Sequence, residues 1–502
     1  MNRRDFMAGL AGIPILGGFF AAYFGQRNFQ TSLKENILSE IDLPLIKEQG
    51  SDFDKPVKGD AIRLGIIGVG SRGSSILESM GFSKEDIKDH SHADLNIQIT
   101  AVCDVYDTHA EEGLTYSRFN KYSDSKRTFP QARRYKHYQE LLHSNEVDAV
   151  IIVSPDHWHA QMIIDTIQAG KHIYCEKCLT RTIEEAYLVY DRLSESKIVF
   201  QYGHQNRQQK SYDIARAIIK KGILGKITVI KSHTNRNNQR GAWIRNLGKE
   251  NTDPAQVDWA QWLGSSPQVP FSTDRFFGWQ KYFEYSGGLP AHMFSHEYDA
   301  LNQVLDLGIP RSVVASGGIY YWKDQRNTPD VLQAVFEYPE KELILTYDAT
   351  LSSSSTGMYE SGAKVKELFG SDAWMRLGLN IDVIPDRHSK RFRQKIDNGT
   401  ITPNIPFLSY HPGRDSGKVD AITSATEKLY AGQGLVYTFK NGKKVDVTYL
   451  HIREWLEAIR TGGKPSGSVQ TAFEDAITCL MATKAYREQR RVVWDPLNKK
   501  VI

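Results

Sequence analysis

A glycine-rich turn between an apolar strand and an amphipathic helix constrains this chain more than any other feature. The apolar run 62–67 leads into Gly-Val-Gly-Ser-Arg-Gly at 68–73, and apolar residues follow at helical spacing. In a dinucleotide-binding fold the first glycine permits a tight turn, the second lets the backbone approach a pyrophosphate, and the third lets the helix pack on the strand. The motif predicts a phosphate-binding turn made by Gly68, Gly70, Ser71, Arg72 and Gly73.

An acidic residue ends the next apolar segment. Residues 97–103 have the pattern of a strand, and Asp104 follows directly. A carboxylate at this position can accept both ribose hydroxyl groups of NAD and would repel the additional phosphate of NADP. A polar insertion at 82–96 accounts for the long spacing between Gly73 and Asp104. We therefore expect NAD as the cofactor rather than NADP.

Strand and helix patterns alternate from residue 61 to residue 203. Buried strand patterns at 147–153, 172–175 and 198–202 alternate with helical patterns at 160–168 and 183–194. This α/β order predicts a doubly wound parallel sheet of the Rossmann type. Ligand contacts are expected at the carboxyl ends of its strands, which carry Asp104, Ser154, Pro155, His157, Trp158, His159, Glu176, Lys177 and Gln205.

The pattern changes after residue 203. Strand-like runs joined mostly by short turns lie at 227–233, 312–321, 332–337, 343–350, 364–368 and 435–439. They predict an α+β domain over 204–502, built on a large, mostly antiparallel sheet with one face free for binding. Helical patterns at 211–221, 451–461 and 471–488 accompany these strands.

The first 60 residues precede the predicted domains. Arg3 and Arg4, followed by Phe6 and the apolar stretch 7–24, are typical of a twin-arginine export signal. An ordinary N-terminal anchor with two chance arginines is the alternative, and an uncleaved segment would remain as a membrane anchor. We expect a periplasmic protein with a signal at 1–25 and a linker at 26–60, including one short helix around 33–41.

Composition excludes several classes of function. The formal net charge of +4 is spread over 502 residues without a long basic block, so nucleic acid is not an expected partner. Four cysteines are too few for a disulfide scaffold. Cys175 and Cys178 form a Cys-x-x-Cys motif, which permits a redox or metal site, but no second pair stands at zinc-like spacing. We favour two structural cysteines and expect no metal.

Ordered motifs along the chain resemble the Gfo/Idh/MocA oxidoreductase family. They are GVGSRG, CDVY, SPDHWHA, GKHIYCEKCLT, GGLPAHMFSHEYD and the tail HIREWLEAIRTGGKPSG, and the resemblance covers roughly residues 62 to 495. In that family a Glu-Lys-Pro motif places the lysine near the nicotinamide; here Glu176-Lys177-Cys178 keeps the lysine and replaces the proline. The family's acid/base histidine matches His296, and His292 stands where those dehydrogenases usually carry an aspartate.

The resemblance implies Lys177, His296 and His292 as catalytic residues. Two histidines one helical turn apart also fit a metal pair or a structural pair, and no third ligand is evident. Arginine and aromatic side chains suit sugar hydroxyl groups and ring faces, although aromatic residues serve equally well in a core. On this basis we expect substrate contacts from Arg240, Trp243 and Tyr285, and we add Asp299 because it follows His296 on the same expected helix.

The sequence favours an exported NAD-dependent oxidoreductase that moves a hydride between nicotinamide and a carbinol of a sugar, polyol or glycoside. An NAD-dependent glycosidase that works by transient oxidation is the alternative, although the family-109 glycosidases lack lysine at the position of Lys177. A non-catalytic, nucleotide-locked binding protein is a third possibility. The open sheet face, common in the family, favours a homo-oligomer.

Overall fold

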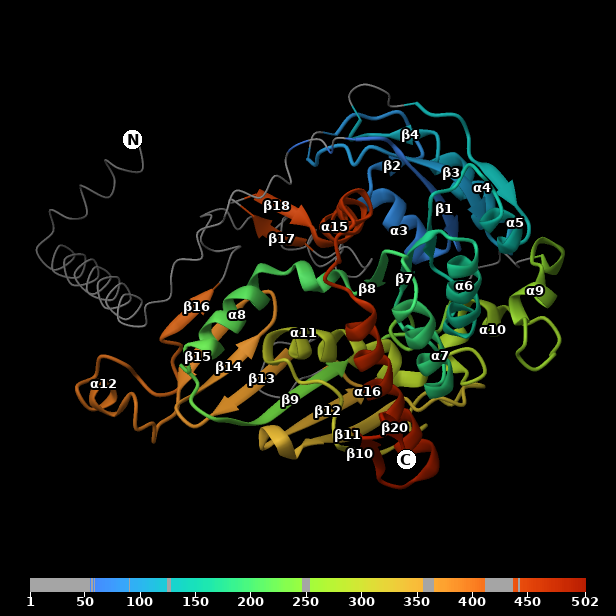
Figure 1. Cartoon of the computed structure of the whole chain (residues 1–502). Coiled ribbons are helices and arrows are strands. Elements are labelled where there is room, and N and C mark those ends of the chain that lie inside the picture. The colour runs from blue at the N-terminus through green and yellow to red at the C-terminus, as the bar shows by residue number, and fades with distance from the viewer. Residues whose placement is uncertain are drawn as a thin grey trace, which may run out of the picture.

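The computed structural model describes residues 55, 57, 59–89, 91–123, 128–245, 253–354, 365–410, 437–440 and 443–502. The expected export signal, and the short helix expected in the linker, lie outside these ranges. The described residues form a six-stranded sheet, a ten-stranded sheet and two small two-stranded sheets (Figure 1). Within the described ranges, no helix combines the length and hydropathy needed to span a bilayer.

The six-stranded sheet is parallel throughout and has the order β5-β3-β1-β6-β7-β8. Its strands are β1 (Ile62–Ile67), β3 (Ile97–Cys103), β5 (Arg133–Tyr135), β6 (Ala149–Ile152), β7 (His172–Glu176) and β8 (Phe200–Gly203). The connecting helices are α3 (Ser71–Ser79), α4 (Asp107–Tyr116), α5 (Tyr138–Leu142), α6 (Asp156–Gln168) and α7 (Ile183–Ser194). The predicted Rossmann-type sheet is confirmed. The strand order reverses between β1 and β6, where a ligand-binding crevice is expected.

Helix α6 begins earlier than the sequence pattern predicted. Pro155 has extended backbone at the N-cap, and Asp156 opens the first turn. An acidic side chain in a first turn is stabilised by the helix dipole. The segment from Asp156 to His159 is therefore helical, so that its side chains point in fixed directions next to the end of β6.

The ten-stranded sheet has the order β16-β15-β14-β13-β9-β12-β11-β10-β19-β20. Its strands are β9 (Ile227–Asn235), β10 (Ser312–Gly318), β11 (Val331–Tyr338), β12 (Leu343–Thr350), β13 (Val365–Gly370), β14 (Ala373–Leu377), β15 (Ile381–Pro385), β16 (Leu408–Tyr410), β19 (Val492–Asp495) and β20 (Lys500–Val501). Neighbours are antiparallel except β9 and β12, which confirms the mostly antiparallel sheet. The strand expected at 435–439 is an exception, because β17 (Tyr437–Lys440) pairs with β18 (Lys443–Asp446) in a separate sheet.

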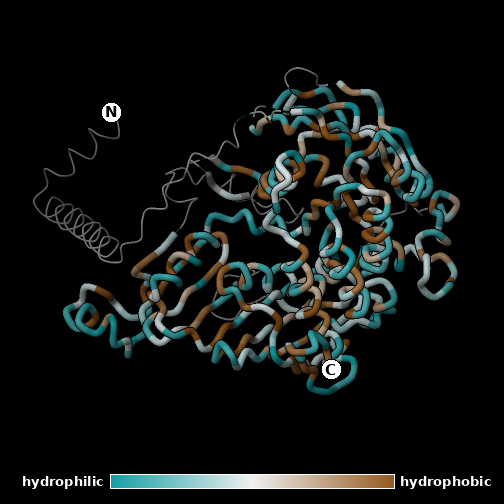
Figure 2. Tube along the Cα trace, in the orientation of Figure 1, coloured by the Kyte–Doolittle hydropathy of each residue, from teal (hydrophilic) through white to brown (hydrophobic). Residues whose placement is uncertain are grey.

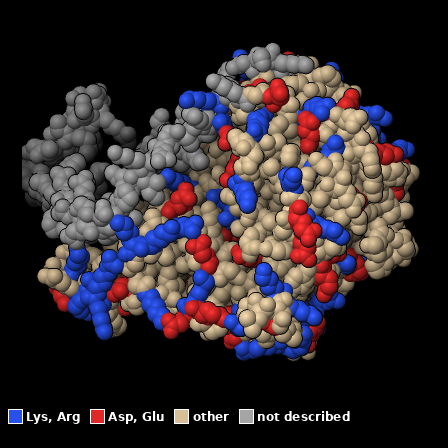
Figure 3. All heavy atoms as spheres, viewed as in Figure 1, with Lys and Arg blue, Asp and Glu red and all other residues tan. Residues whose placement is uncertain are grey.

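One face of the large sheet is covered by helices. Burial alternates along β11 and β12, as expected for strands with one covered face. The covering helices, seen beside the sheet in Figure 1, are α8 (Lys210–Lys220), α11 (Ser295–Leu305) and α16 (Val469–Glu488). Figure 2 shows hydrophobic residues along the strands of both sheets. Figure 3 shows basic and acidic side chains interspersed over much of the viewed surface.

Helix α15 (Val447–Thr461) joins the two parts of the chain. It follows eight of the ten strands of the large sheet in sequence, yet its Tyr449, Trp455 and Leu456 share a hydrophobic cluster with residues of β1 and α3. The predicted boundary at 203/204 therefore separates the two sheets but not two independent cores.

Shorter elements complete the described fold. They are β2 (Phe82–Ser83), β4 (Phe119–Asn120), η2 (Gln205–Gln208), η3 (Pro254–Gln256), α9 (Trp259–Leu263), α10 (Thr273–Phe277), η4 (Trp279–Lys281), η5 (Pro290–Phe294), η6 (Pro339–Lys341) and α12 (Arg393–Asp397).

Candidate active site

A cavity of about 790 Å³ lies at the carboxyl ends of β1, β3, β6 and β7. The first domain lines it with the glycine turn, Asp104 and Lys177, and the second domain lines it with Arg240, His292 and His296. This volume is within the range of ordinary small-molecule sites. Residues far apart in the sequence thus share one binding space.

The glycine turn has the geometry of a phosphate site. Gly68 has φ +90°, and a Cβ there would lie 2.5 Å from the carbonyl oxygen of Val153. A Cβ on Gly73 would lie 2.3 Å from the carbonyl oxygen of Gly68. These two glycines are required by the turn itself. A Cβ on Gly70 would meet nothing nearer than His109 at 3.6 Å, so its backbone faces the open cavity.

Asp104 lines the cavity beside this turn. Its Oδ2 accepts a hydrogen bond from the Val69 N–H at 2.7 Å, and its Oδ1 accepts one from the Tyr106 N–H at 2.9 Å. Burial raises the pKa of Asp104, while His109, 3.7 Å away, and the backbone N–H donors act against that rise. Each carboxylate oxygen retains a lone pair for a ribose hydroxyl group.

Arg72 reaches from the turn across to β7. Its Nε donates to Oε1 of Glu176 at 2.7 Å, and both side chains are largely buried. Burial opposes ionisation of Glu176, but the charge and hydrogen bond of Arg72 lower its pKa overall. The Nη1 and Nη2 atoms of Arg72 are buried without a hydrogen-bond partner. Together with Gly70 and Asp104, these donors fit a dinucleotide.

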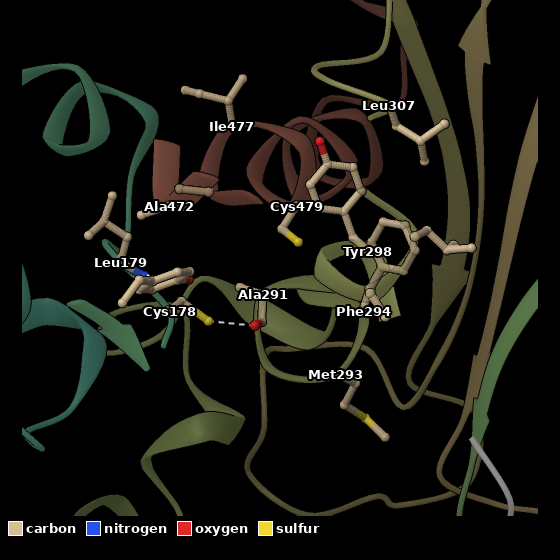
Figure 4. Packing of buried hydrophobic residues seen from close by; sticks show 14 of the residues in the cluster. Cys178, Leu179, Ala291, Met293, Phe294, Tyr298, Leu307, Ala472, Ile477 and Cys479 are labelled. Carbon is tan, nitrogen blue, oxygen red and sulfur yellow. Dashed lines mark hydrogen bonds between the residues drawn. The ribbon is translucent and has the colours of Figure 1, made fainter. Parts of the chain in front are cut away.

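Lys177 follows β7 and is held from several sides. Its Nζ donates to the His292 carbonyl oxygen at 3.2 Å. The next residue, Cys178, donates from Sγ to the Ala291 carbonyl oxygen at 2.5 Å, as Figure 4 shows. Both ring nitrogens of His159 lie near carbonyl oxygens, of Cys178 at 2.5 Å and of Ser154 at 2.8 Å. The ends of β6 and β7 and the histidine segment are thereby fixed to one another.

The described cysteines have the character of core residues. All four are unbridged and buried. Burial raises the pKa values of the Cys175 and Cys178 thiols well above their usual range, and a neutral thiol is a poor nucleophile. The structure favours packing roles for both, in agreement with the interpretation that we preferred from the sequence.

His292 and His296 enter the cavity from one continuous helical segment. His292 lies in η5, a π-helical turn, and His296 lies at the start of α11. The Nε2 atom of His292 is 3.2 Å from Oδ2 of Asp156, which also accepts the Gly287 N–H at 3.0 Å. Burial lowers the pKa of His292, with Asp156 acting in the opposite direction. A neutral imidazole beside an ionised aspartate is suited to accept a proton.

A third histidine, His204, packs against His296. The ring centroids of His296 and His204 are 5.2 Å apart, and Nε2 of His204 is 3.3 Å from Oδ2 of Asp475. Asp475 also accepts the Tyr202 hydroxyl group at 2.8 Å. The ring of His296 therefore packs against a histidine that belongs to a buried polar network.

Most of the residues that the sequence singled out come together here. Those that line the cavity are Gly68, Gly70, Ser71, Arg72, Gly73, Asp104, Ser154, Pro155, Trp158, Glu176, Lys177, Gln205, Arg240, His292 and His296.

Other expected residues lie behind the cavity wall. His157 hydrogen-bonds to the Trp262 carbonyl oxygen at 2.9 Å, and His159 makes the contacts described above. The ring of Trp243 packs against His292, with centroids 5.7 Å apart. Tyr285 is buried, with its hydroxyl oxygen accepting from Arg275, and Asp299 is ion-paired with Arg207 at 2.5 Å. Of the side chains expected to contact substrate, the structure thus brings Arg240 to the cavity and places Trp243, Tyr285 and Asp299 outside it.

Several residues that line the cavity were not predicted from the sequence. Arg245 and His109 had no motif around them, whereas Trp262, Phe276 and Phe277 lie in an aromatic-rich stretch that was a usable signal. Asp156 was assigned no role, because its contact with His292 joins positions far apart in the chain.

Asp156, Cys178 and His292 also bring their donor atoms within 4.8 Å of one another. Such a set is compatible with a metal ion. The Cys178 thiol donates to the Ala291 carbonyl oxygen and Nε2 of His292 lies 3.2 Å from Oδ2 of Asp156, whereas Oδ1 of Asp156 is buried without a hydrogen-bond partner among the described residues.

Comparison with known proteins identifies the first domain. Residues 62–204 match the family model "Oxidoreductase family, NAD-binding Rossmann fold" (GFO_IDH_MocA). The first domain is therefore similar to the NAD-binding Rossmann domains of this oxidoreductase family, in agreement with the site geometry and with the resemblance that the motifs indicated.

Curated relatives match over part of their length. Levoglucosan dehydrogenase of Pseudarthrobacter phenanthrenivorans is 28% identical over 190 residues, which are 36% of this chain and 41% of that protein. A glycosyl hydrolase family 109 protein of Shewanella pealeana is 31% identical over 138 residues, 27% of this chain and 26% of that protein. The matched segment is thus less than half the length of either relative.

Solved structures extend the likeness to most of the chain. Levoglucosan dehydrogenase in complex with NADH and levoglucosan aligns with a TM-score of 0.56 at 16% identity, covering 86% of this chain and 99% of that one. The WlbA dehydrogenase from Bordetella pertussis, in complex with NADH and UDP-GlcNAcA, aligns with a TM-score of 0.58 at 14% identity, covering 88% and 99%. At these identities the likeness shows a shared fold for both domains.

Proposed function

We propose that the protein is an NAD-dependent oxidoreductase that acts on a CH–OH group of a sugar, polyol or glycoside. One observation carries the proposal: the glycine turn and Asp104 line the same cavity as Lys177, His292 and His296. A cofactor site and proton-transfer groups in one space suit hydride transfer coupled to proton transfer. The name of the relative levoglucosan dehydrogenase supports a carbohydrate substrate.

NAD, when bound, supplies the hydride acceptor. The Asp104 carboxylate and the backbone at Gly70 hold the dinucleotide, and Arg72 contributes its two unpartnered nitrogen atoms. Lys177, fixed by the His292 carbonyl oxygen, holds the oxygen of the reacting carbinol. His296 accepts the carbinol proton, and His292, paired with Asp156, is the second candidate for that role.

The test measures NADH absorbance with a panel of sugars and polyols, using Lys177→Met and His296→Gln variants. Loss of a positioned proton-transfer group reduces the rate about 10²- to 10⁴-fold, so we expect kcat to fall in that range. The exposed residues Lys500 and His143 provide matched controls, Lys500→Met and His143→Gln. Wild-type turnover in both catalytic variants would overturn these roles. NAD binding without turnover of any substrate would favour a binding protein.

A glycosidase is the second candidate function. The relatives include family 109 proteins and an alpha-N-acetylgalactosaminidase of Shewanella oneidensis, 31% identical over 138 residues. Chromogenic glycosides tested with the same variants distinguish the two functions. Aglycone release without net NADH formation would establish redox-assisted cleavage, and NADH accumulation with a free sugar would establish a dehydrogenase.

We further propose export by the twin-arginine route and assembly into a homo-oligomer. The sequence Arg3-Arg4 before an apolar stretch supports export to the periplasm, with or without a retained membrane anchor. Replacement of both residues by lysine is expected to hold the protein in the cytoplasm during cell fractionation, while an Arg133→Lys control is exported. Light scattering of the purified protein measures its oligomeric state, and a monomer would contradict the second proposal.

A further inference from the structure

The substrate side of the cavity is basic. Its wall includes Lys177, Arg240 and Arg245. Among the described residues that line it, the acidic ones are Asp104, beside the glycine turn, and Glu176, whose charge is already paired with Arg72. The guanidinium groups of Arg240 and Arg245 are therefore not paired with either of these two carboxylates.

The arginines form a cluster with a third. Arg236, Arg240 and Arg245 follow β9 in one short segment, and Nη1 of Arg245 donates to the Arg240 carbonyl oxygen at 3.1 Å. Burial lowers the pKa of Arg245, and the positive charges of Arg240 and Arg236 lower it further. Burial also lowers the pKa of Arg236. The charge of Glu297 acts against this lowering at Arg236, but among the described parts of the chain no carboxylate forms a salt bridge with any of the three arginines. Grouping like charges this way is unfavourable unless an anion neutralises them.

The segment that carries the cluster is held in a defined shape. The Arg236 N–H donates to the Thr350 carbonyl oxygen at 2.9 Å, and the Gly241 N–H donates to Oδ1 of Asn238 at 2.6 Å. The buried Arg326 donates from Nη2 to the Ala242 carbonyl oxygen at 2.9 Å. Trp243 adopts a left-handed backbone with φ +61°, which is unusual for a bulky residue and is kept only where the surroundings enforce it. These contacts fix the backbone of the segment that carries the three arginines.

The same segment adjoins the proposed reaction centre. The rings of Trp243 and Trp279 both pack against His292, with centroid distances of 5.7 and 5.0 Å, and of the two tryptophans Trp279 lines the cavity. Arg240 and Arg245, which flank Trp243 in the sequence, are therefore placed to contact the part of a substrate that extends beyond the reacting carbon.

We propose that the substrate is an anionic carbohydrate whose carboxylate or phosphate group binds Arg240 and Arg245. Guanidinium groups pair with both kinds of anion through two parallel hydrogen bonds. Arg236 supplies additional positive potential from behind. The proposal rests on the proposed oxidoreductase function, since Lys177 holds the carbinol oxygen at the same time.

The experiment compares matched substrates with NAD: a neutral hexose, the corresponding uronate and the corresponding hexose 6-phosphate. For the wild type we expect kcat/KM at least about 30-fold higher for one of the anionic compounds than for the hexose. In an Arg240→Gln/Arg245→Gln variant this ratio falls toward one. The control Arg490→Gln, an exposed arginine near the C-terminus, keeps the wild-type ratio. A preference for the uronate identifies a carboxylate, and a preference for the phosphate identifies a phosphoryl group.

Two results would overturn the proposal. One is a wild type that oxidises the neutral hexose as well as its anionic counterparts. The other is a double variant in which the dissociation constant of NAD, measured by calorimetry, rises as much as the substrate KM, because the arginines would then bind the cofactor.

A binding measurement separates this proposal from the oxidoreductase function. With NAD present, the uronate or the hexose phosphate should raise the melting temperature of the wild type but not of the double variant. If no compound is oxidised and this shift is still seen, the oxidoreductase assignment fails and the anion site stands. If neither anion shifts the melting temperature, the anion site fails whatever the activity.

Discussion

The Asp156 carboxylate lies 3.2 Å from Nε2 of His292, although the two residues come from different domains. Asp156 opens helix α6 at the edge of the Rossmann sheet, and His292 belongs to the π-helical turn that leads into α11. The contact fixes the imidazole relative to Lys177, whose Nζ binds the carbonyl oxygen of the same histidine. The two domains therefore meet at the reaction centre itself.

An Asp156→Asn variant tests this contact. Asparagine can still accept the Gly287 N–H, so the fold should persist, but the charge that holds the imidazole is lost. We expect kcat to fall about 10- to 100-fold, the scale at which small misplacements of a catalytic group act. The dissociation constant of NAD should stay within about twofold. Asp191→Asn, on the exposed side of α7, is the control. Unchanged kcat would show that the contact is structural only.

The glycine turn predicts opposite outcomes for two alanine substitutions. Gly68→Ala places a Cβ 2.5 Å from a backbone oxygen at φ +90°, and we expect an unstable or unfolded protein. Gly70→Ala has room for its Cβ but occupies the face that receives the pyrophosphate, so the protein should fold and bind NAD at least about tenfold more weakly. Circular dichroism and calorimetry measure the two effects. Normal NAD binding by Gly70→Ala would place the phosphates elsewhere.

We expect Asp104 to determine the choice of dinucleotide in this site. An Asp104→Asn variant keeps an acceptor for the Val69 N–H but loses the negative charge. We expect the affinity for NAD to fall about tenfold and the preference for NAD over NADP to narrow, because repulsion of the ribose phosphate is removed. Fluorescence titration with both nucleotides measures the ratio. A ratio equal to that of the wild type would assign the discrimination to other residues.

Buried histidines predict how the stability depends on pH. Burial lowers the pKa of His157 to about 4 and that of His451 to about 4. His451 accepts a hydrogen bond at Nδ1 from the Gln201 amide, whose orientation is set by the Gly467 N–H, so the neutral ring is the one that fits.

Between pH 6.5 and about 4 the unfolded chain therefore binds protons that the folded chain does not, and the free energy of unfolding falls as the pH drops. Each of the two histidines should remove about 2 kcal/mol between pH 7 and pH 5. Urea unfolding at several pH values measures this, and His451→Gln should flatten the dependence, whereas the exposed-site control His143→Gln should not. An equally steep dependence in His451→Gln would contradict the assignment.

The regular parts of the fold were predictable because local patterns specify them. The helix predicted at 183–194 has these bounds in the structure, since Thr182 and Glu185 form a capping box at its start. The glycine turn, Asp104 and Lys177 were found because parallel strands bring their carboxyl ends to one edge.

The remaining site residues depend on contacts that no local pattern contains. Asp299 was expected near substrate because it follows His296 on the same helix, yet it faces Arg207 of η2. Tyr285 was expected there for its residue type, but the aromatic cluster around Trp262 encloses it. Arg245 lines the cavity and follows the turn at Trp243. The left-handed backbone of Trp243 could not be predicted from the sequence.

Helix α15 has a consequence for the synthesis of the protein. It adds Tyr449, Trp455 and Leu456 to the core around β1, nearly four hundred residues upstream in the chain. A growing polypeptide therefore cannot complete its nucleotide-binding half until residue 461 has left the ribosome. The stability of the nucleotide-binding half is thereby tied to a segment that is translated near the end of the chain.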